Sequence, residues 1–446
     1  MKKMKKLFAV LLTLAMVMGM SLTTFAAKKE SATIKVNGAD SATLSYAQVI
    51  VPDQTTVTGW AFVDGVAAYY TAAFGVSDAQ VAIQMMIDNT FTGTQMDKAL
   101  SDVAKNVTFA PMANPQTVTV AGVYAVKAEE AKFSYKPMAA YVGFGEVVDD
   151  AGEVTYEYPS LLDTELNAKK SSIDLTKSVA DDDFVTQIGK TLTFTVTTKV
   201  PYIPYNATNR SFTVVDAIQG AEYDLTDATV TMDGEPVDAE FVEGDSSFTV
   251  DLSALVNADN TNAGKDIVIT YKAVVTDLTV NNRAANNVSG TEIDFSETSL
   301  VTGSLQLTKV DNTDAKNPLA NAEFELLDAQ GVALKFTKVG DDYIYNENGE
   351  TKLVSDEEGL IVVKGLDVGT YKFSETKAPE GYKLVEEDKE ATITKDALSA
   401  SVEFVNTKLS ALPSTGGIGT AVFTIGGCAI MVAAAYFFLA SRKKES

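Results

Sequence analysis

A two-residue alternation of apolar and polar side chains constrains the fold of this chain more than any other feature. In Lys190–Val196, alternate positions carry Leu192, Phe194 and Val196, and threonines stand between them. This is the period of a strand with one buried face. Turn signals such as Asp233-Gly234 and Asn348-Gly349 separate further runs of this kind at Ala32–Val36, Thr117–Val123, Ser211–Val215, Ser247–Leu252, Asp266–Val274, Leu305–Val310, Leu360–Val363 and Thr370–Phe373. We therefore predict an all-β protein built of tandem Ig-like β-sandwich domains.

One segment departs from this pattern. Between residues 77 and 106 the apolar residues fall at helical spacing, at Val81, Met85 and Ile87 and then at Met96, Leu100 and Val103. Such spacing favours short amphipathic helices over strands. We expect them to form a helical insertion in the first of three domains.

The composition excludes several kinds of function. The 446 residues include no His and one Cys, so the chain offers no Ser-His-Asp or Cys-His apparatus and no disulfide within itself. The net charge of −24 argues against nucleic acid as a partner, because phosphate contacts need clustered Lys and Arg. We expect a protein without metal or cofactor that is not an enzyme acting on an external substrate.

The two ends of the chain indicate export and anchoring. Residues 1–26 combine four lysines, an apolar stretch and the small residues Thr24 and Ala26, which is typical of a cleaved signal peptide. Residues 418–440 are uncharged and long enough to span a bilayer core of about 30 Å. Arg442, Lys443 and Lys444 follow at once, and positive charges stay on the cytoplasmic side.

Directly before this span stand Leu412, Pro413, Ser414, Thr415 and Gly416. The order of LPSTG, apolar span and basic tail resembles the cell-wall sorting signal of Gram-positive surface proteins. The resemblance implies that a sortase cysteine attacks the carbonyl of Thr415, releases Gly416 and leaves an acyl-enzyme that an amine resolves. We therefore expect a secreted protein that is covalently anchored in the cell wall or in a pilus, with sortase and peptidoglycan among its partners.

The body of the chain carries further resemblances. The run Tyr371–Tyr382 matches the E-box of collagen-adhesin B-type domains, and it lies between Leu305–Lys309 and Val402–Asn406, which resemble that domain's first and last strands. The preceding region resembles the fimbrial isopeptide-forming middle domain, and the first region resembles an N-terminal pilin domain in outline. We place these domains at residues 301–410, 169–300 and 27–168, followed by the sorting signal at 411–446. Together the resemblances imply a backbone pilin of a sortase-assembled Gram-positive pilus.

Each of the two later domains has strands that place one polar residue in register with apolar core residues. Strand alternation puts the members of each of the following triplets on one face. In the last domain the triplets are Leu305, Leu307 and Lys309; Tyr371, Phe373 and Glu375; and Val402, Phe404 and Asn406. In the middle domain they are Ile173, Leu175 and Lys177; Phe212, Val214 and Asp216; and Ala284, Asn286 and Val288. A buried amine, carboxyl and amide are costly if they stay unpaired, so the repeated arrangement indicates a purpose.

The chemistry that would use these groups is amide formation between Lys and Asn. Burial should lower the pKa of the lysine and raise that of the carboxyl, giving a neutral amine beside a protonated acid. The resemblance implies bonds from Lys309 to Asn406, assisted by Glu375, and from Lys177 to Asn286, assisted by Asp216. An ordinary buried ion pair with a hydrogen-bonded Asn is the alternative. In the middle domain, Asn287 and Lys169 or Lys170 compete for the assignment.

A backbone pilin also needs a lysine that receives the sorting signal of the next subunit. The resemblance places it just ahead of the middle domain, where the chain reads Lys169-Lys170 without the family's Tyr-Pro before the lysine. Lys170 is out of phase with the inward series that leads to Lys177, so we expect it to face solvent and prefer it. Lys169, Lys136 and a purely solvated surface role are the alternatives.

Two functions remain open from sequence. The first is a structural polymer subunit whose partners are other copies of itself and accessory pilins. The second is a monomeric wall-anchored adhesin whose first domain binds a host or microbial ligand. The lysines ahead of the middle domain favour the polymer.

Overall fold

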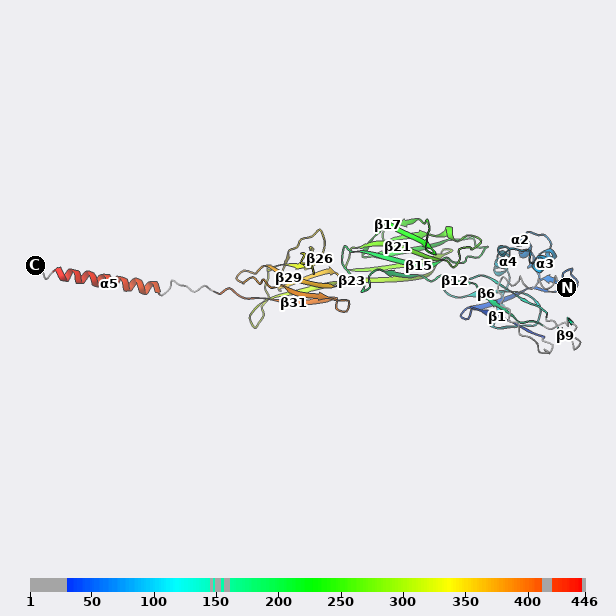
Figure 1. Ribbon diagram of the computed structural model, residues 1–446, viewed down its shortest axis with the longest axis horizontal. Coiled ribbons are helices and arrows are strands. Elements are labelled where there is room, and N and C mark those ends of the chain that lie inside the picture. The colour runs from blue at the N-terminus through cyan, green and yellow to red at the C-terminus, as the bar shows by residue number, and fades with distance from the viewer. Residues whose placement is uncertain (1–29, 145–146, 149–153, 156–160, 411–418, 443–446) are drawn as a thin grey trace. The chain divides into compact units, whose positions relative to one another are not determined.

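The computed structural model describes residues 30–144, 147–148, 154–155, 161–410 and 419–442 (Figure 1). It divides into two compact units, one of residues up to Gly303 with Gly365–Asp367, and one of Ser304–Lys364 with the residues after Asp367. The first unit contains the predicted first and middle domains. The described residues are mostly strands, which confirms the all-β prediction.

The first domain is layered around a central sheet that is buried on both faces. One neighbouring layer is the three-stranded sheet of β11 (Thr164–Asn167), β1 (Ala32–Asn37) and β5 (Gln116–Val118). The central sheet has the order β3 (Trp60–Phe62), β2 (Thr43–Pro52), β6 (Gly122–Glu129) and β8 (Met138–Val142), with β4 (Ala110–Pro111) also paired to β2. Small ladders join β9 (Val147–Val148) to β10 (Val154–Thr155) and β7 (Phe133–Tyr135) to β12 (Lys170–Ser172).

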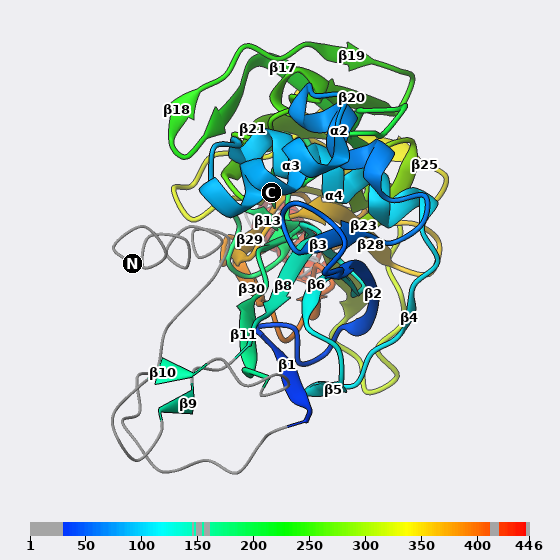
Figure 2. The same cartoon turned by 90° about the vertical axis from the view of Figure 1, so that its right-hand side faces the viewer.

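Three helices form the other layer of this domain. They are α2 (Ala67–Phe74), α3 (Ala79–Asp88) and α4 (Gly93–Asn106), and in Figure 2 they gather on the side of β2 and β6 opposite β1 and β5. Asp78 caps α3, and Thr92 and Gln95 form a capping box at the start of α4. The helices predicted within residues 77–106 are confirmed, whereas α2 was not predicted.

The predicted strand Thr117–Val123 is wrong as one element, because the chain breaks between β5 and β6. Gly122 has a φ of +143°, and a Cβ there would stand 2.0 Å from the carbonyl oxygen of Ile50. Only glycine allows the backbone of β6 to approach β2 this closely. The break lets the two strands join different sheets.

The middle domain is a sandwich of one five-stranded sheet and part of a larger, ten-stranded sheet around one apolar core. The first sheet has the order β13 (Thr176–Val179), β15 (Thr191–Lys199), β21 (Asp266–Val275), β17 (Ala221–Met232) and β18 (Glu235–Pro236). The second has the order β19 (Phe241–Glu243), β20 (Ser247–Asp251), β16 (Phe212–Gln219), β22 (Thr279–Val288) and β23 (Thr291–Asp311). The domain also contains β14 (Val185–Thr186), paired to β23, and the 3-10 helix η2 (Ser253–Leu255). Buried residues alternate along β15 as its sequence predicts.

The last domain is a second sandwich. One sheet joins β31 (Ser399–Asn406), the end of β23, β28 (Leu360–Leu366), β26 (Asp342–Tyr345) and β25 (Phe336–Val339). The other has the order β27 (Leu353–Val354), β24 (Glu323–Leu327), β29 (Gly369–Lys377) and β30 (Lys389–Ile393). Phe324, Phe373 and Phe404 are fully buried between the sheets.

The chain continues into helix α5 (Gly419–Arg442), which coincides with the predicted apolar span. Its segment Val422–Ser441 has a mean hydropathy of 2.1 and is long and apolar enough to cross a membrane. The predicted signal peptide and the motif Leu412–Gly416 lie outside the described residues.

Candidate functional site

The last domain brings Lys309, Glu375 and Asn406 into one buried cluster. Lys309 lies on β23 and Asn406 on β31, the first and last strands, which run side by side in parallel. Glu375 reaches them from β29 in the opposite sheet. The side chains of Lys309 and Glu375 are 0% exposed, and Asn406 is equally buried.

The contacts leave this cluster with one unsatisfied oxygen. The carboxylate of Glu375 accepts hydrogen bonds from Asn406 Nδ2 at 2.9 and 3.1 Å and from the Val385 N–H at 2.9 Å. The amine of Lys309 stands 3.9 Å from Glu375 Oε1 and donates to the carbonyl oxygen of Phe404 at 3.1 Å. Within the described part of the chain, Asn406 Oδ1 is buried without a hydrogen-bond partner. The amine of Lys309 and the amide nitrogen of Asn406 therefore face one buried carboxylate, and the amide oxygen is left unpartnered.

Burial also changes the protonation of the amine. It lowers the pKa of Lys309 from 10.5 to about 8, and the nearby Glu375 charge only partly opposes this effect. A substantial fraction of the amine is then neutral near pH 8. Only the neutral amine has the lone pair that a nucleophile needs.

The middle domain holds a second buried lysine. Lys177 on β13 contacts the carboxylate of Asp216 on β16, and both side chains are 0% exposed. The hydroxyl of Tyr271 also contacts Lys177 Nζ, and the hydroxyl of Tyr223 donates to Asp216 Oδ1 at 2.9 Å. Burial lowers the pKa of Lys177 to about 8, while Asp216 opposes the shift. The structure thus brings Lys177 and Asp216 together in the predicted way.

Asn286, the amide assigned to this lysine from sequence, has other partners. Its Nδ2 donates to the carbonyl oxygen of Ile173 at 2.6 Å and to Thr198 Oγ1 at 3.0 Å, and its Oδ1 accepts from the Asp294 N–H at 3.0 Å. Every polar atom of this side chain is therefore used in holding neighbouring strands. Asn286 therefore contacts Ile173, Thr198 and Asp294 in this structure, and its assignment to Lys177 stays a prediction.

A different amide, Asn282, stands at the lysine. Its Nδ2 donates to the Tyr271 hydroxyl at 2.9 Å, the same oxygen that Lys177 contacts. Its Oδ1 is buried and unpartnered among the described residues, as Asn406 Oδ1 is in the last domain. Sequence reasoning missed Asn282, although it occupies the same face of β22 as Ala284 and Asn286.

The three lysines proposed for linkage have different surroundings. Lys170 Nζ lies 3.3 Å from Glu130 and 4.2 Å from the centre of the Phe133 ring, and its side chain is one-third exposed. Hydrogen bonds with Tyr135 and Glu130 raise the pKa of Lys170. Lys136 pairs with Asp97 at 3.0 Å. The contacts of Lys170 favour its charged form, which opposes its use as a nucleophile.

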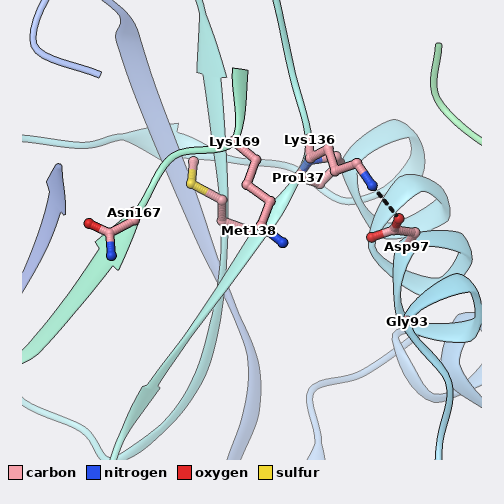
Figure 3. Close-up of a pocket in the computed structure, with 7 residues that line it drawn as sticks. All are labelled: Gly93, Asp97, Lys136, Pro137, Met138, Asn167 and Lys169. Atoms are coloured by element: carbon pink, nitrogen blue, oxygen red, sulfur yellow. Dashed lines mark hydrogen bonds and ion pairs between the residues drawn. The ribbon is translucent and has the colours of Figure 1, made fainter. Parts of the chain in front are cut away.

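Lys169, unlike Lys170 and Lys136, has no ion pair among the described residues. It lines a pocket of about 240 Å³ together with Gly93, Asp97, Lys136, Pro137, Met138 and Asn167. Figure 3 shows its amine beside Met138, apart from the ion pair between Lys136 and Asp97. The neighbouring backbone is fixed, because the Lys136 N–H donates to the Lys169 carbonyl oxygen at 3.0 Å. Lys169 is therefore an exposed lysine whose backbone is hydrogen-bonded to that of Lys136.

Among the described residues, no group of three or more Asp, Glu, Cys or His side chains is arranged to hold a metal ion.

Comparisons with known proteins agree with this architecture. Residues 303–408 match the family of prealbumin-like fold domains called SpaA, and residues 405–446 match the LPXTG cell wall anchor motif. The fimbrial subunit type 2 of Actinomyces naeslundii is 25% identical over 388 residues, covering 71% of this chain and 72% of that protein.

Two solved structures show the same fold at low sequence identity. The T6 backbone pilin of serotype M6 Streptococcus pyogenes has a TM-score of 0.57 at 17% identity, covering 82% of this chain and 80% of that one. The major pilin SpaD of Corynebacterium diphtheriae has a TM-score of 0.50 at 15% identity, covering 87% and 99%. Both of these proteins are backbone or major pilins.

The LPXTG anchor motif and the similarity to a fimbrial subunit support a cell-wall or pilus location in a Gram-positive bacterium. A prealbumin-like SpaA domain directly before an LPXTG anchor, on a fold similar to that of solved pilins, supports a major pilin of the sortase-assembled kind.

Proposed function

We propose that this protein is the backbone subunit of a covalently polymerised pilus. A sortase joins Thr415 of one subunit to Lys169 of the next, and intramolecular Lys–Asn bonds stabilise each subunit. The observation that carries the proposal is the buried cluster of Lys309, Glu375 and Asn406. In it an amine with a lowered pKa and the amide nitrogen of Asn406 face one carboxylate, and the amide oxygen has no hydrogen-bond partner among the described residues.

The bond in the last domain forms without any outside reagent. Lys309 Nζ attacks Cγ of Asn406, a new C–N bond forms, and the bond from Cγ to Nδ2 breaks. Glu375 takes a proton from the attacking amine and passes one to Nδ2, which leaves as ammonia. The hydrogen bonds from Nδ2 to Glu375 in the present geometry support this route for the proton.

In the middle domain the proposed bond joins Lys177 to Asn282, with Asp216 as the proton carrier. Asn282 replaces Asn286 because it shares the Tyr271 hydroxyl with the lysine and has a free buried carbonyl oxygen. The amide of Asn286 instead holds Ile173, at the start of the domain, to β22 and accepts from the Asp294 N–H.

The linking lysine is proposed to be Lys169 and not Lys170. A nucleophile must lose its proton and reach the acyl-enzyme, and the contacts of Lys170 with Glu130 and Tyr135 oppose both. Lys169 presents its amine in a pocket and has no ion pair among the described residues.

A cell-wall extract blotted with an antibody against this chain tests the polymer. We expect a ladder of high-mass multimers from the parent, which Lys169→Arg abolishes while the monomer stays secreted and anchored. Lys170→Arg and Lys136→Arg are matched controls that keep the ladder. Tandem mass spectrometry of the linked peptide then identifies the lysine joined to Thr415.

The same blot separates the polymer from the monomeric adhesin. A single wall-linked band from the parent overturns the polymer proposal. A ladder that survives Lys169→Arg but disappears with Lys170→Arg or Lys136→Arg keeps the polymer and moves the linkage to that lysine.

A further inference from the structure

The two buried clusters orient their carboxylates by different means. In the last domain, Glu375 is held by the backbone N–H of Val385 and by the amide of Asn406. In the middle domain, the hydroxyl of Tyr223 holds one oxygen of Asp216, and Lys177 contacts the other. In the middle domain a tyrosine hydroxyl thus donates to the carboxylate, whereas in the last domain a backbone N–H and a side-chain amide do so.

The tyrosines come from adjacent strands of the sheet that faces Asp216. Tyr271 lies on β21 and Tyr223 on β17, with ring centres 5.8 Å apart in a T-shaped arrangement. Phe194 and Phe248 pack against the Tyr271 ring at 5.6 and 4.8 Å. Tyr271 is 1% exposed, so its hydroxyl is fixed by packing and has no access to bulk water.

The Tyr271 hydroxyl meets both reacting nitrogens. A hydroxyl has two acceptor positions and one hydrogen to donate. Lys177 Nζ and Asn282 Nδ2 fill the acceptor positions. The hydrogen is left for Asp216, and the bond with this carboxylate contributes to raising the pKa of Tyr271. One oxygen therefore contacts the nucleophile and the leaving nitrogen and bonds the proton carrier.

Both tyrosines remain neutral hydroxyls at any physiological pH. Burial raises the pKa of Tyr223 and of Tyr271, and the adjacent Asp216 charge adds to the shift. Each hydroxyl can donate to the carboxylate throughout the pH range in which Lys177 loses its proton.

We propose that Tyr271 is a catalytic residue of the middle-domain bond, aligning Lys177 Nζ with the amide of Asn282, and that Tyr223 is a positioning residue that turns Asp216 toward the lysine. The inference rests on the proposed Lys177–Asn282 bond. Nζ attacks Cγ of Asn282 and the bond from Cγ to Nδ2 breaks. Asp216 carries one proton from Nζ to Nδ2, and ammonia leaves. Tyr271 holds the two nitrogens together during this transfer and undergoes no net change.

The test separates chemistry from folding. The full chain is made in a cell-free reaction, quenched into urea before the bonds form, and diluted at about pH 5, where a lysine with a lowered pKa stays protonated. Near-ultraviolet circular dichroism establishes that each variant has folded. A jump to about pH 9 starts the reaction, and peptide mass spectrometry follows each ammonia loss separately.

We expect Tyr271→Phe to slow formation of the Lys177 bond by about 100- to 1,000-fold, as is typical when one preorganised hydrogen-bonding group is removed from a reacting centre. Tyr223→Phe should slow it less, and Asp216→Ala should abolish it. The Lys309–Asn406 bond of the same molecules is the internal reference. Its rate of formation should be the same in all three variants as in the parent. Tyr202→Phe, at a buried tyrosine outside the site, is the matched control and leaves both rates unchanged.

Three outcomes are decisive. If Tyr271→Phe folds and forms the Lys177 bond at the parental rate, the catalytic role of Tyr271 is overturned. If the parent forms no Lys177 bond while the Lys309 bond appears, the proposed middle-domain bond is itself wrong, which is a different failure. If Tyr271→Phe does not fold at about pH 5, Tyr223→Phe decides the inference, because a parental rate in that variant overturns the positioning role.

Discussion

Lys309 and Asn406 lie on the first and last strands of the last domain, two strands that run in parallel with Asp311 opposite Asn406. A bond between these two side chains therefore closes nearly the whole domain into a covalent ring. Force that enters through β23 and leaves after β31 would pass through this bond and not through the sheet hydrogen bonds. For a fibre subunit without a disulfide, this is the position at which a cross-link gives the most mechanical resistance.

The first prediction concerns the number of bonds. The mature ectodomain should be lighter than its sequence mass by two ammonia molecules in intact-mass measurement. Glu375→Ala should restore one of them and Asp216→Ala the other, because each removes the carboxyl that carries the proton. An unmodified mass in the parent protein would show that both clusters are ordinary ion pairs.

The second prediction distinguishes the two buried amides of β22. Asn282→Ala should restore one ammonia, since it removes the amide that shares the Tyr271 hydroxyl with Lys177. Asn286→Ala should leave the bond in place but lower the free energy of unfolding by about 1–3 kcal/mol. The reason is that the buried carbonyl oxygen of Ile173 and the buried N–H of Asp294 each lose a hydrogen-bond partner. Peptide mapping of the parent checks the assignment directly. A Lys177–Asn286 peptide would restore the assignment made from sequence.

The contrast between these amides shows how far the sequence can be used. The two-residue period correctly places Lys309, Glu375 and Asn406 in the core of the last domain, because each strand has one buried face. The same period puts both Asn282 and Asn286 inward on β22. It cannot say which one a lysine on another strand will reach, since that depends on strand register. In the structure Asp216 pairs with Ala284, midway between the two.

The lysines ahead of the middle domain illustrate a second limit. The phase of the strand predicts that Lys170 points away from the core, and its side chain is partly exposed. The alternation of inward and outward residues along the strand does not predict that Glu130 and Phe133, which lie far earlier in the chain, will contact the amine of Lys170. Such partners arise from the pairing of β7 with β12, which is a tertiary contact. Helix α2 was missed because its apolar residues do not form a single stripe.

The third prediction concerns stability. A bond from Lys309 to Asn406 closes a loop of roughly 100 residues, which on the chain-entropy model of cross-links is worth about 4–5 kcal/mol. Glu375→Ala should therefore lower the melting temperature of the last domain and open it to protease, and Asp216→Ala should do the same to the middle domain. Calorimetry and limited digestion measure both effects. Melting and digestion like the parent would remove the structural role assigned to the bonds.

The last prediction uses the buried amine itself. In Asn406→Ala, Lys309 stays free in the core with a pKa of about 8, against 10.5 for an ordinary lysine. Below about pH 8 the folded state has to hold a buried charge, and above the unfolded pKa both states are neutral. The unfolded state binds more protons between these values, so the free energy of unfolding must rise with pH across this window. The gain is at most about 3 kcal/mol for a shift of this size. Urea unfolding of the last domain at about pH 7 and pH 10 measures it.

The control for this prediction is Lys309→Met in the Asn406→Ala background. It removes the titrating amine but keeps an apolar chain of similar length, so the rise with pH attributable to Lys309 should disappear. Other groups that titrate in the same window, such as exposed lysines and tyrosines, contribute equally to both variants and cancel in the comparison. If the two variants respond to pH in the same way, Lys309 does not have the lowered pKa on which its role as a nucleophile depends.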